Sequence, residues 1–211
     1  SDPTADGPVI QRSSARGVKA GMHLGEVMEM TRKIREISEV PIILFSYYNP
    51  IMAYGAEAFY RDSIKAGADG VLVVDLPPEE SDELTAGWRG NSFCLIRLVA
   101  PTTLEDRMHM ITQGASGFMY MVSMTGVTGS GGLDMTQIKN YVQQLRQFAN
   151  LPICVGFGIS TPADVASVSA IADGVVIGSA FERTIEENLA NPDVAAIIGR
   201  QTAEYKEATR G

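Results

Sequence analysis

The sequence predicts an α/β protein built as a β/α barrel, and three observations carry that prediction. Short apolar runs alternate with helical stretches along the whole chain of 211 residues. These runs recur roughly every 22 to 35 residues, the spacing that a crossover between parallel strands requires. The last two runs both end in glycine, as in the phosphate-binding turns that follow the final strands of such a barrel.

The predicted strands are compact and nearly continuous in apolar character, which is typical of parallel strands covered on both faces. Strands are expected at 42–48, 70–74, 93–99, 118–123, 153–155 and 175–177. Helices are expected at 24–38, 57–66, 104–112, 134–148, 179–189 and 193–208, with shorter ones opening near Pro8, Pro77 and Pro162. Arg97 is a charge inside a strand, for which an acidic partner or a place at the barrel rim is expected.

Six strands are two fewer than a closed eight-stranded barrel needs. The chain is therefore either an open doubly wound sheet or a barrel without its opening elements. Residues 1–8 resemble the middle of a loop, and the two glycine turns come in tandem. We therefore expect a (β/α)8 TIM barrel lacking roughly its first two strands and first helix, with residues 1–211 as a single partial domain.

Composition excludes several classes of protein. The net charge of −8 argues against a nucleic-acid or anionic-membrane surface. No apolar run approaches the ~20 residues that cross a bilayer. Cys94 and Cys154 stand alone in apolar runs, so we expect reduced, buried thiols in a cytoplasmic protein, with no disulfide and no metal site.

The two glycine turns are the first candidate site. One is Gly156-Phe157-Gly158, with Ser160 or Thr161 as the cap of the next helix, and the other is Gly178-Ser179. Glycine lets a ligand approach the backbone, and a helix N-terminus favours an anion. No Lys or Arg stands beside either turn, so backbone amides would hold a phosphate. The alternative is that these glycines only form tight turns.

Further candidates lie where predicted strands end, which is where barrel enzymes carry their catalytic groups. The sequence offers no Ser-His-Asp set, metal-ligand cluster or P-loop. Aspartate with aromatic neighbours and a phosphate grip suggests acid/base chemistry on a flat, apolar, phosphorylated substrate. The candidates are Asp2, Asp6, Tyr47, Asn49, Asp75, Tyr120 and Thr128.

At these same residues the sequence resembles the α subunit family of tryptophan synthase, over essentially the whole chain. The opening loop and the Gly-Val-Thr-Gly loop are the specific motifs, whereas the last glycine turns would fit many phosphate-binding barrels. The matching segments, in family order, are 1–11, 47–50, 73–80, 126–129, 156–160 and 178–180.

The resemblance implies retro-aldol cleavage of indole-3-glycerol phosphate to indole and glyceraldehyde 3-phosphate, a lyase step in L-tryptophan biosynthesis that needs no cofactor in this subunit. Asp6 matches the catalytic aspartate, which accepts a hydrogen bond from the indole N–H. From the residues alone, Asp6 could instead be the N-cap of the helix after Pro8.

The resemblance also assigns the residues that bind the substrate. Tyr120 and Phe157 would flank the indole, and Tyr47 would lie near the glycerol. Thr128 would sit on a mobile lid that touches Asp6 on closure. Without the resemblance, the aromatic residues could be core and the glycine-rich run a linker. The residues implied to hold the phosphate are Gly129, Gly158, Gly178 and Ser179.

Asp2, Pro3 and Asp75 match positions where the family meets its β subunit, the pyridoxal-phosphate enzyme of the α2β2 heterotetramer. Without the resemblance, they are solvated loop residues.

The family's proton-transfer glutamate precedes the signature loop, so we expect this chain alone to be impaired in catalysis. Met124 is a second departure, because some members of the family carry a basic residue at this position before Gly-Val-Thr-Gly.

The alternative function is a non-catalytic α-type partner that modulates the β subunit. Another phosphate-binding barrel enzyme fits less well, because its extra Lys or metal-binding His residues are missing.

Overall fold

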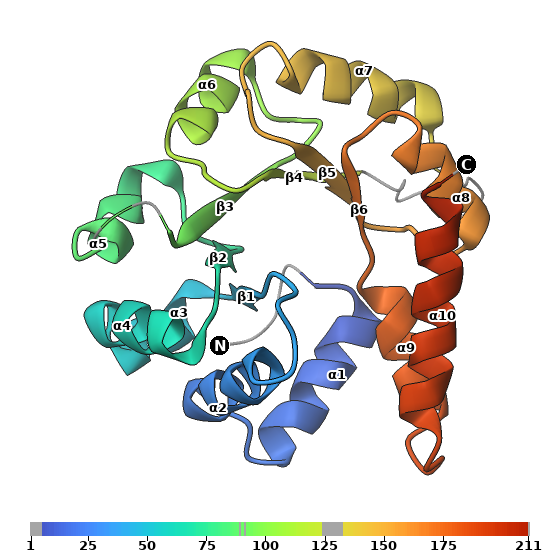
Figure 1. Ribbon diagram of the computed structural model, residues 1–211. Coiled ribbons are helices and arrows are strands. Elements are labelled where there is room, and N and C mark those ends of the chain that lie inside the picture. The colour runs from blue at the N-terminus through green and yellow to red at the C-terminus, as the bar shows by residue number, and fades with distance from the viewer. Residues whose placement is uncertain (1–5, 89, 91, 124–132, 211) are drawn as a thin grey trace.

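Six parallel strands form one sheet in the order in which they occur along the chain (Figure 1). The computed structural model describes residues 6–88, 90, 92–123 and 133–210. The strands are β1 (Ile43–Ser46), β2 (Gly70–Val73), β3 (Cys94–Val99), β4 (Met119–Val122), β5 (Ile153–Gly156) and β6 (Gly174–Val176). The expected succession of six parallel strands in a partial barrel is confirmed.

Helices connect the strands and lie around the outside of the curved sheet (Figure 1). In the first half they are α1 (Pro8–Lys19), α2 (Leu24–Arg35), α3 (Tyr48–Tyr54), α4 (Ala56–Ala66), the 3-10 turn η1 (Pro78–Glu80) and α5 (Ser81–Thr85). In the second half they are α6 (Glu105–Gln113), α7 (Met135–Leu145), α8 (Pro162–Ser169), α9 (Ser179–Glu187) and α10 (Val194–Ala208).

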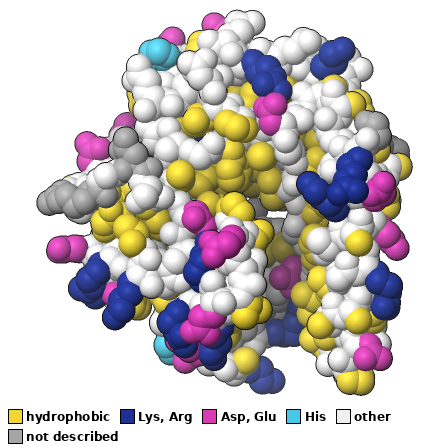
Figure 2. All heavy atoms as spheres, viewed as in Figure 1, with side chains coloured by type: hydrophobic (Ala, Val, Ile, Leu, Met, Phe, Trp, Pro, Cys, Tyr) yellow, Lys and Arg dark blue, Asp and Glu magenta, His cyan; other side chains and the backbone are white. Residues whose placement is uncertain are grey.

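Alternation along the strands divides the core into an outer and an inner layer. In β3, Leu95 and Val99 pack against the helices, while Ile96 faces inward with Leu72 and Tyr120. Side chains of a strand point alternately to opposite faces, so every second residue reaches the concave side. The space-filling view shows apolar side chains gathered at the middle of the face and charged ones around it (Figure 2). Polar groups at the ends of the strands therefore border an apolar interior.

The sheet has two free edges, because β1 pairs only with β2 and β6 only with β5 among the described residues. Helix α1 lies beside α9 across this opening (Figure 1). Two arginines of α1 reach one carboxylate of α9: Arg12 at 2.7 Å and Arg16 at 3.0 Å from Glu186. Ser13 also donates a hydrogen bond to Glu182. These contacts hold the segment that carries Asp6 close to α9.

Helix α3 is the main departure from the elements expected along the chain. The first strand was expected to run to Tyr48, but it ends at Ser46 and Tyr48 opens a helix. Pro50 lies in the first turn of this helix, where proline is tolerated because its missing N–H would have no partner. The Tyr48 N–H donates to Asp75 Oδ1 at 2.7 Å. A side chain from the next strand end thus supports a helix that local sequence does not indicate.

Arg97 also departs from expectation. It lies within β3, faces the helices and is 5% exposed, so it is not at the rim. Among the described residues no carboxylate forms an ion pair with it. The expected acidic partner is present only as charge nearby, because Glu79 and Asp82 act on Arg97 electrostatically without an ion pair. No described helix is long and apolar enough to cross a membrane.

Candidate functional site

A cavity of about 680 Å³ lies where β5 and β6 end, roofed by the segment that leads into α1. Its wall combines parts of the chain that are far apart in sequence, from Asp6 to Arg183. The structure brings six of the expected site residues together in this wall: Asp6, Tyr120, Phe157, Gly158, Gly178 and Ser179.

Asp6 directs its carboxylate toward a tyrosine and not toward its own helix. The Tyr47 hydroxyl donates to Asp6 Oδ2 at 2.8 Å. Gly7 is the N-cap of α1, and no described side chain caps the N-terminus of this helix. The alternative reading of Asp6 as an N-cap was therefore wrong. Gln11 Nε2 donates to the Asp6 backbone oxygen at 2.8 Å, which fixes the entry of the chain into α1.

Tyr120 stands against the backbone of β5. A Cβ built on Gly156 would lie 2.4 Å from the Tyr120 hydroxyl oxygen, so glycine there is what admits the ring. Tyr120 is 8% exposed. Burial, and then the negative charge of Asp6, raise the pKa of Tyr120. The Tyr120 hydroxyl is accordingly neutral near pH 7 and close enough to the Asp6 carboxylate to interact with it electrostatically.

The turn after β5 holds an aromatic side chain out of the core. Phe157 and Gly158 both have positive φ, 84° and 76°. A left-handed backbone costs a non-glycine residue about 1–2 kcal/mol, so the surroundings must hold it. Ser123, 1% exposed, does so by donating its hydroxyl to Phe157 O at 2.5 Å and Gly156 O at 3.0 Å. Phe157 remains 48% exposed and lines the cavity.

The two helix N-termini near the cavity differ. At α8 the expected Thr161 cap is confirmed, as a capping box in which Asp164 accepts from the backbone of Ser160 and Thr161. Burial would raise the pKa of Asp164, yet these hydrogen bonds lower it overall. A carboxylate therefore already occupies the anion position of α8. Helix α9 instead begins at the cavity after Gly178, and no side chain from the described part of the chain caps it.

A cation that the sequence analysis did not single out lies in the same wall. Arg183, exposed on α9, lines the cavity one helical turn beyond Ser179. Residues four apart on a helix share a face, so this spacing could have indicated it. The expectation that backbone amides alone face a phosphate thus omitted a nearby guanidinium. Glu182 lines the wall too, where it accepts the hydrogen bond from Ser13.

Comparison with known proteins agrees with this geometry. The family model described as tryptophan synthase alpha chain matches residues 1–210. The chain belongs to the tryptophan synthase alpha chain family. The tryptophan synthase alpha chain of Desulfosudis oleivorans is 61% identical over 210 residues, which are 100% of this chain and 79% of that protein. This membership makes the chain a lyase-family protein of tryptophan biosynthesis.

Solved structures of tryptophan synthase share the fold. The alpha subunit from Legionella pneumophila superposes with a TM-score of 0.91 at 38% identity, covering 100% of this chain and 78% of that one. A structure of the tryptophan synthase α2β2 complex from Pyrococcus furiosus superposes with a TM-score of 0.87 at 32% identity, covering 98% of this chain and 83% of that one.

The remaining positions singled out by the family resemblance fall into two groups. Asp75 is exposed on the turn after β2, and its carboxylate binds the Tyr48 N–H, so it supports a neighbouring loop. It lies outside the wall of the cavity around Asp6. The other group lies outside the described residues: Asp2, Pro3, Met124, Thr128 and Gly129.

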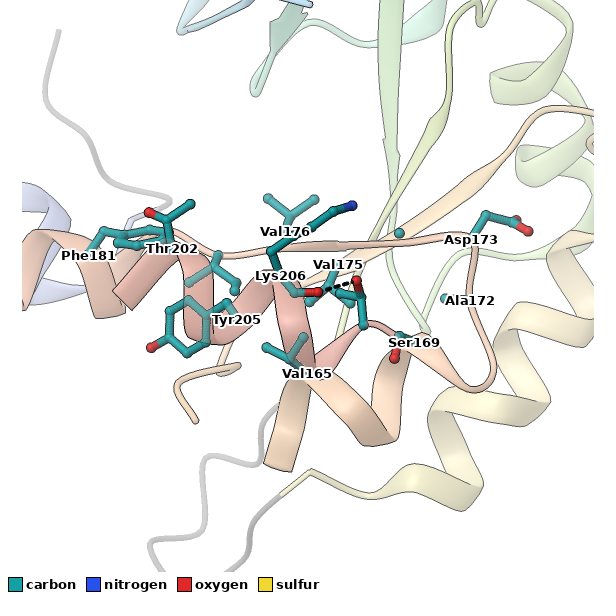
Figure 3. Close-up of a pocket in the computed structure, with 13 residues that line it drawn as sticks. Val165, Ser169, Ala172, Asp173, Val175, Val176, Phe181, Thr202, Tyr205 and Lys206 are labelled. Carbon is teal, nitrogen blue, oxygen red and sulfur yellow. Dashed lines mark hydrogen bonds between the residues drawn. The ribbon is translucent and has the colours of Figure 1, made fainter. Parts of the chain in front are cut away.

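A second cavity, of about 630 Å³, lies on the helix side of β6, between α8 and α10 (Figure 3). Val165, Val175 and Tyr205 point into it and make it largely apolar. Its carboxylate, Asp173, accepts from Ile153 N at 2.8 Å and from Arg146, and these contacts lower the pKa of Asp173. None of the described residues expected to bind substrate lines this cavity, so the cavity around Asp6 is the candidate active site. Among the described residues, no three His, Cys, Asp or Glu could jointly hold a metal ion.

Proposed function

We propose that the chain is the tryptophan synthase subunit that cleaves indole-3-glycerol phosphate to indole and glyceraldehyde 3-phosphate, with residues 1–211 acting as one domain. The observation that carries this proposal is a single cavity whose wall contains both the Asp6 carboxylate and the Gly158 and Gly178 turns. The substrate has the matching parts, an indole N–H that needs an acceptor and a phosphate that needs backbone donors.

In this proposal the indole lies between Tyr120 and Phe157, whose rings both line the cavity. Asp6 Oδ1 accepts the indole N–H; it has no hydrogen-bond partner among the described residues, whereas Oδ2 accepts from Tyr47. Protonation at C3 of the indole puts positive charge on the ring nitrogen. A fixed carboxylate beside that nitrogen favours the charged intermediate more than the neutral substrate, and such differential stabilisation accelerates a reaction.

The bond changes balance without a redox group, in keeping with a subunit that needs no cofactor. The side-chain hydroxyl loses its proton and becomes a carbonyl as the bond to C3 breaks. The electron pair of that bond returns to the protonated ring and restores neutral indole. Proton transfers alone are therefore required of the protein.

The phosphate is proposed to rest on the N–H group of Gly158, on the turn after β5, and on those of Gly178 and Ser179 at the start of α9, with Arg183 near it. Unpaired N–H groups and the dipole of a helix N-terminus favour an anion. Among the described residues, no atom lies within 4 Å of a Cβ built on Gly178, which leaves room for the group. By the family resemblance, Gly129 would add a further donor and Thr128 would touch Asp6 when the lid closes.

We further propose that residues 1–211 cleave the substrate slowly on their own. The resemblance assigns proton transfer to a glutamate that precedes the signature loop, and Glu182 in the cavity wall is engaged by Ser13. Without a positioned proton-transfer group a reaction typically slows by ~10²–10⁴-fold. Asp2, Pro3 and Asp75 are the proposed contacts with a β subunit, which would supply pyridoxal phosphate and form an α2β2 assembly.

The test combines binding with turnover. The probe is 3-(indol-3-yl)propyl phosphate, which keeps the indole and phosphate but has no reacting hydroxyl. Asp6→Asn should lower indole release from indole-3-glycerol phosphate by on the order of 10²-fold while the probe still binds. Asp106→Asn, on the exposed face of α6, is the matched control and should change neither.

Two outcomes would contradict the proposal. Equal turnover by Asp6→Asn and the unsubstituted chain would remove Asp6 from the reaction. Turnover by residues 1–211 at the rate of a full-length relative would refute the slow-cleavage proposal, because it would show that the missing proton-transfer group is not needed.

A further inference from the structure

A third cavity, of about 390 Å³, lies on the helix side of the sheet, beside the turn that follows β2. It shares no lining residue with the cavity around Asp6. Its walls are mostly apolar or backbone, with Leu76, Pro77 and Ile111 among them. Its charged residues are Arg97, Arg107 and Asp75. Arg107 is paired with Glu79, which leaves Arg97 as the arginine of the wall to account for.

Arg97 is the unusual member of that wall. It is 5% exposed, and its Nε has no hydrogen-bond partner among the described residues. Its Nη1 reaches the Leu76 carbonyl oxygen only at 3.5 Å, the limit of a hydrogen bond. The end of α6 makes room for it, since a Cβ on Gly114 would lie 3.3 Å from Arg97 Nη2. The fold thus leaves space for the guanidinium, but the described residues do not supply hydrogen-bond acceptors for all of its N–H groups.

The other charges of the wall already have partners. Arg107 forms an ion pair with Glu79. Asp75 accepts the Tyr48 N–H. Burial lowers the pKa of Arg97, but a guanidinium stays protonated in proteins. Glu79 and Asp82 act on Arg97 electrostatically without forming an ion pair with it. The guanidinium therefore has acidic neighbours but keeps a buried N–H, at Nε, that no described residue accepts.

We propose that this cavity binds a small carboxylate, whose two oxygens pair with the Arg97 guanidinium and whose apolar body packs on Leu76, Pro77 and Ile111. The planar guanidinium matches a carboxylate in a two-point interaction. The nearby carboxylates of Asp75, Glu79 and Asp82 make a monoanion a better match than a doubly charged phosphate ester. This site would be separate from the cavity around Asp6, and it does not depend on the reaction proposed there.

The test uses sodium benzoate as the probe and benzamide as its uncharged counterpart, followed by NMR. On titration with benzoate, the Arg97 Nε–H and Gly114 N–H signals should shift and saturate. Benzamide should bind at least tenfold more weakly, because it offers one oxygen and no charge. Arg97→Met should abolish saturable binding at these positions, whereas Arg61→Met, which removes an exposed arginine paired with Asp62 on α4, should leave it unchanged.

Arg97→Lys gives a second measurement that keeps the buried charge and removes the planar fork, so it should weaken benzoate at least tenfold even if the methionine variant folds poorly. Three results would overturn the proposal: no saturable shift at Arg97, equal binding of benzoate and benzamide, or shifts confined to Gly178 and Ser179. Asp6→Asn should leave benzoate binding unchanged, so the failure of either proposal can be recognised separately.

Discussion

Replacing Gly156 by alanine tests the packing that holds the proposed indole site. The new Cβ would lie 2.4 Å from Cε2 and the hydroxyl oxygen of Tyr120 and 2.7 Å from Cζ. Ordinary carbon contacts begin near 3.5 Å, so the ring must move by about 1 Å. Tyr120 is 8% exposed and packs with Leu72 and Ile96, so it has little space to retreat.

The expected cost follows from the behaviour of overpacked cores. Forcing an extra methyl into a well-packed site typically costs about 1–3 kcal/mol. For a chain of this size each kcal/mol lowers the melting temperature by about 2–4 °C. We therefore expect Gly156→Ala to lower the melting temperature by roughly 2–12 °C. Binding of the indole phosphate probe should weaken as well, since the displaced ring forms one wall of its proposed site.

The assay is urea unfolding, with a double-mutant cycle to isolate the clash. Tyr120→Leu removes the ring that the new methyl meets, so Gly156→Ala should cost much less in that background. Gly199→Ala is the control: no atom of the described residues lies within 4 Å of a Cβ built there, and alanine within α10 should stabilise by up to ~1 kcal/mol. The reasoning is refuted if Gly156→Ala is neutral, or if its cost is the same with and without the Tyr120 ring.

Three further predictions concern single contacts. Thr161→Ala removes the hydroxyl that accepts from Asp164 N at 3.1 Å and should cost about 1 kcal/mol in urea unfolding; an unchanged midpoint would contradict the role of the cap. Glu186→Gln tests the link between α1 and α9: hydrogen bonds from Arg12 lower the pKa of Glu186 to about 2, so its stabilisation is present above pH 4.5 and lost as pH falls toward 2. The melting temperatures of the variant and the unsubstituted chain should therefore differ at pH 7 and converge in acid. A difference in melting temperature that does not change with pH would contradict this assignment. Tyr47→Phe removes the hydroxyl that donates to Asp6 and should lower kcat/KM on the order of tenfold. An unchanged kcat/KM would contradict this role of Tyr47.

The regular part of the fold could be predicted because each element repeats the same local chemistry. Apolar runs such as Ile153–Gly156 are covered on both faces and follow one another at crossover spacing, which leaves few arrangements other than a parallel sheet. Helix α3 could not be predicted, because its first N–H is satisfied by Asp75 from the next strand end. Partners distant in sequence leave no local signal.

The candidate site divides in the same way. Gly158 and Gly178 were indicated by their place after the last two strands. The family resemblance indicated Asp6, but not that Tyr47 would hold its carboxylate from 41 residues away. Arg97 is an anomaly already in the sequence, but only the fold brings η1 and α6 beside it and leaves its Nε without a hydrogen-bond partner among the described residues. Side-chain burial and contacts between residues distant in sequence depend on the tertiary structure, so the sequence alone does not predict them.

The central claim is that one cavity holds both ends of an indole phosphate, and an NMR titration with 3-(indol-3-yl)propyl phosphate tests it most directly. We predict saturable shifts of the backbone amides of Gly158, Gly178 and Ser179, together with contacts between the indole ring and the rings of Tyr120 and Phe157. Shifts that appear instead around the cavity between α8 and α10, with the amides of Gly178 and Ser179 unchanged, would contradict the account.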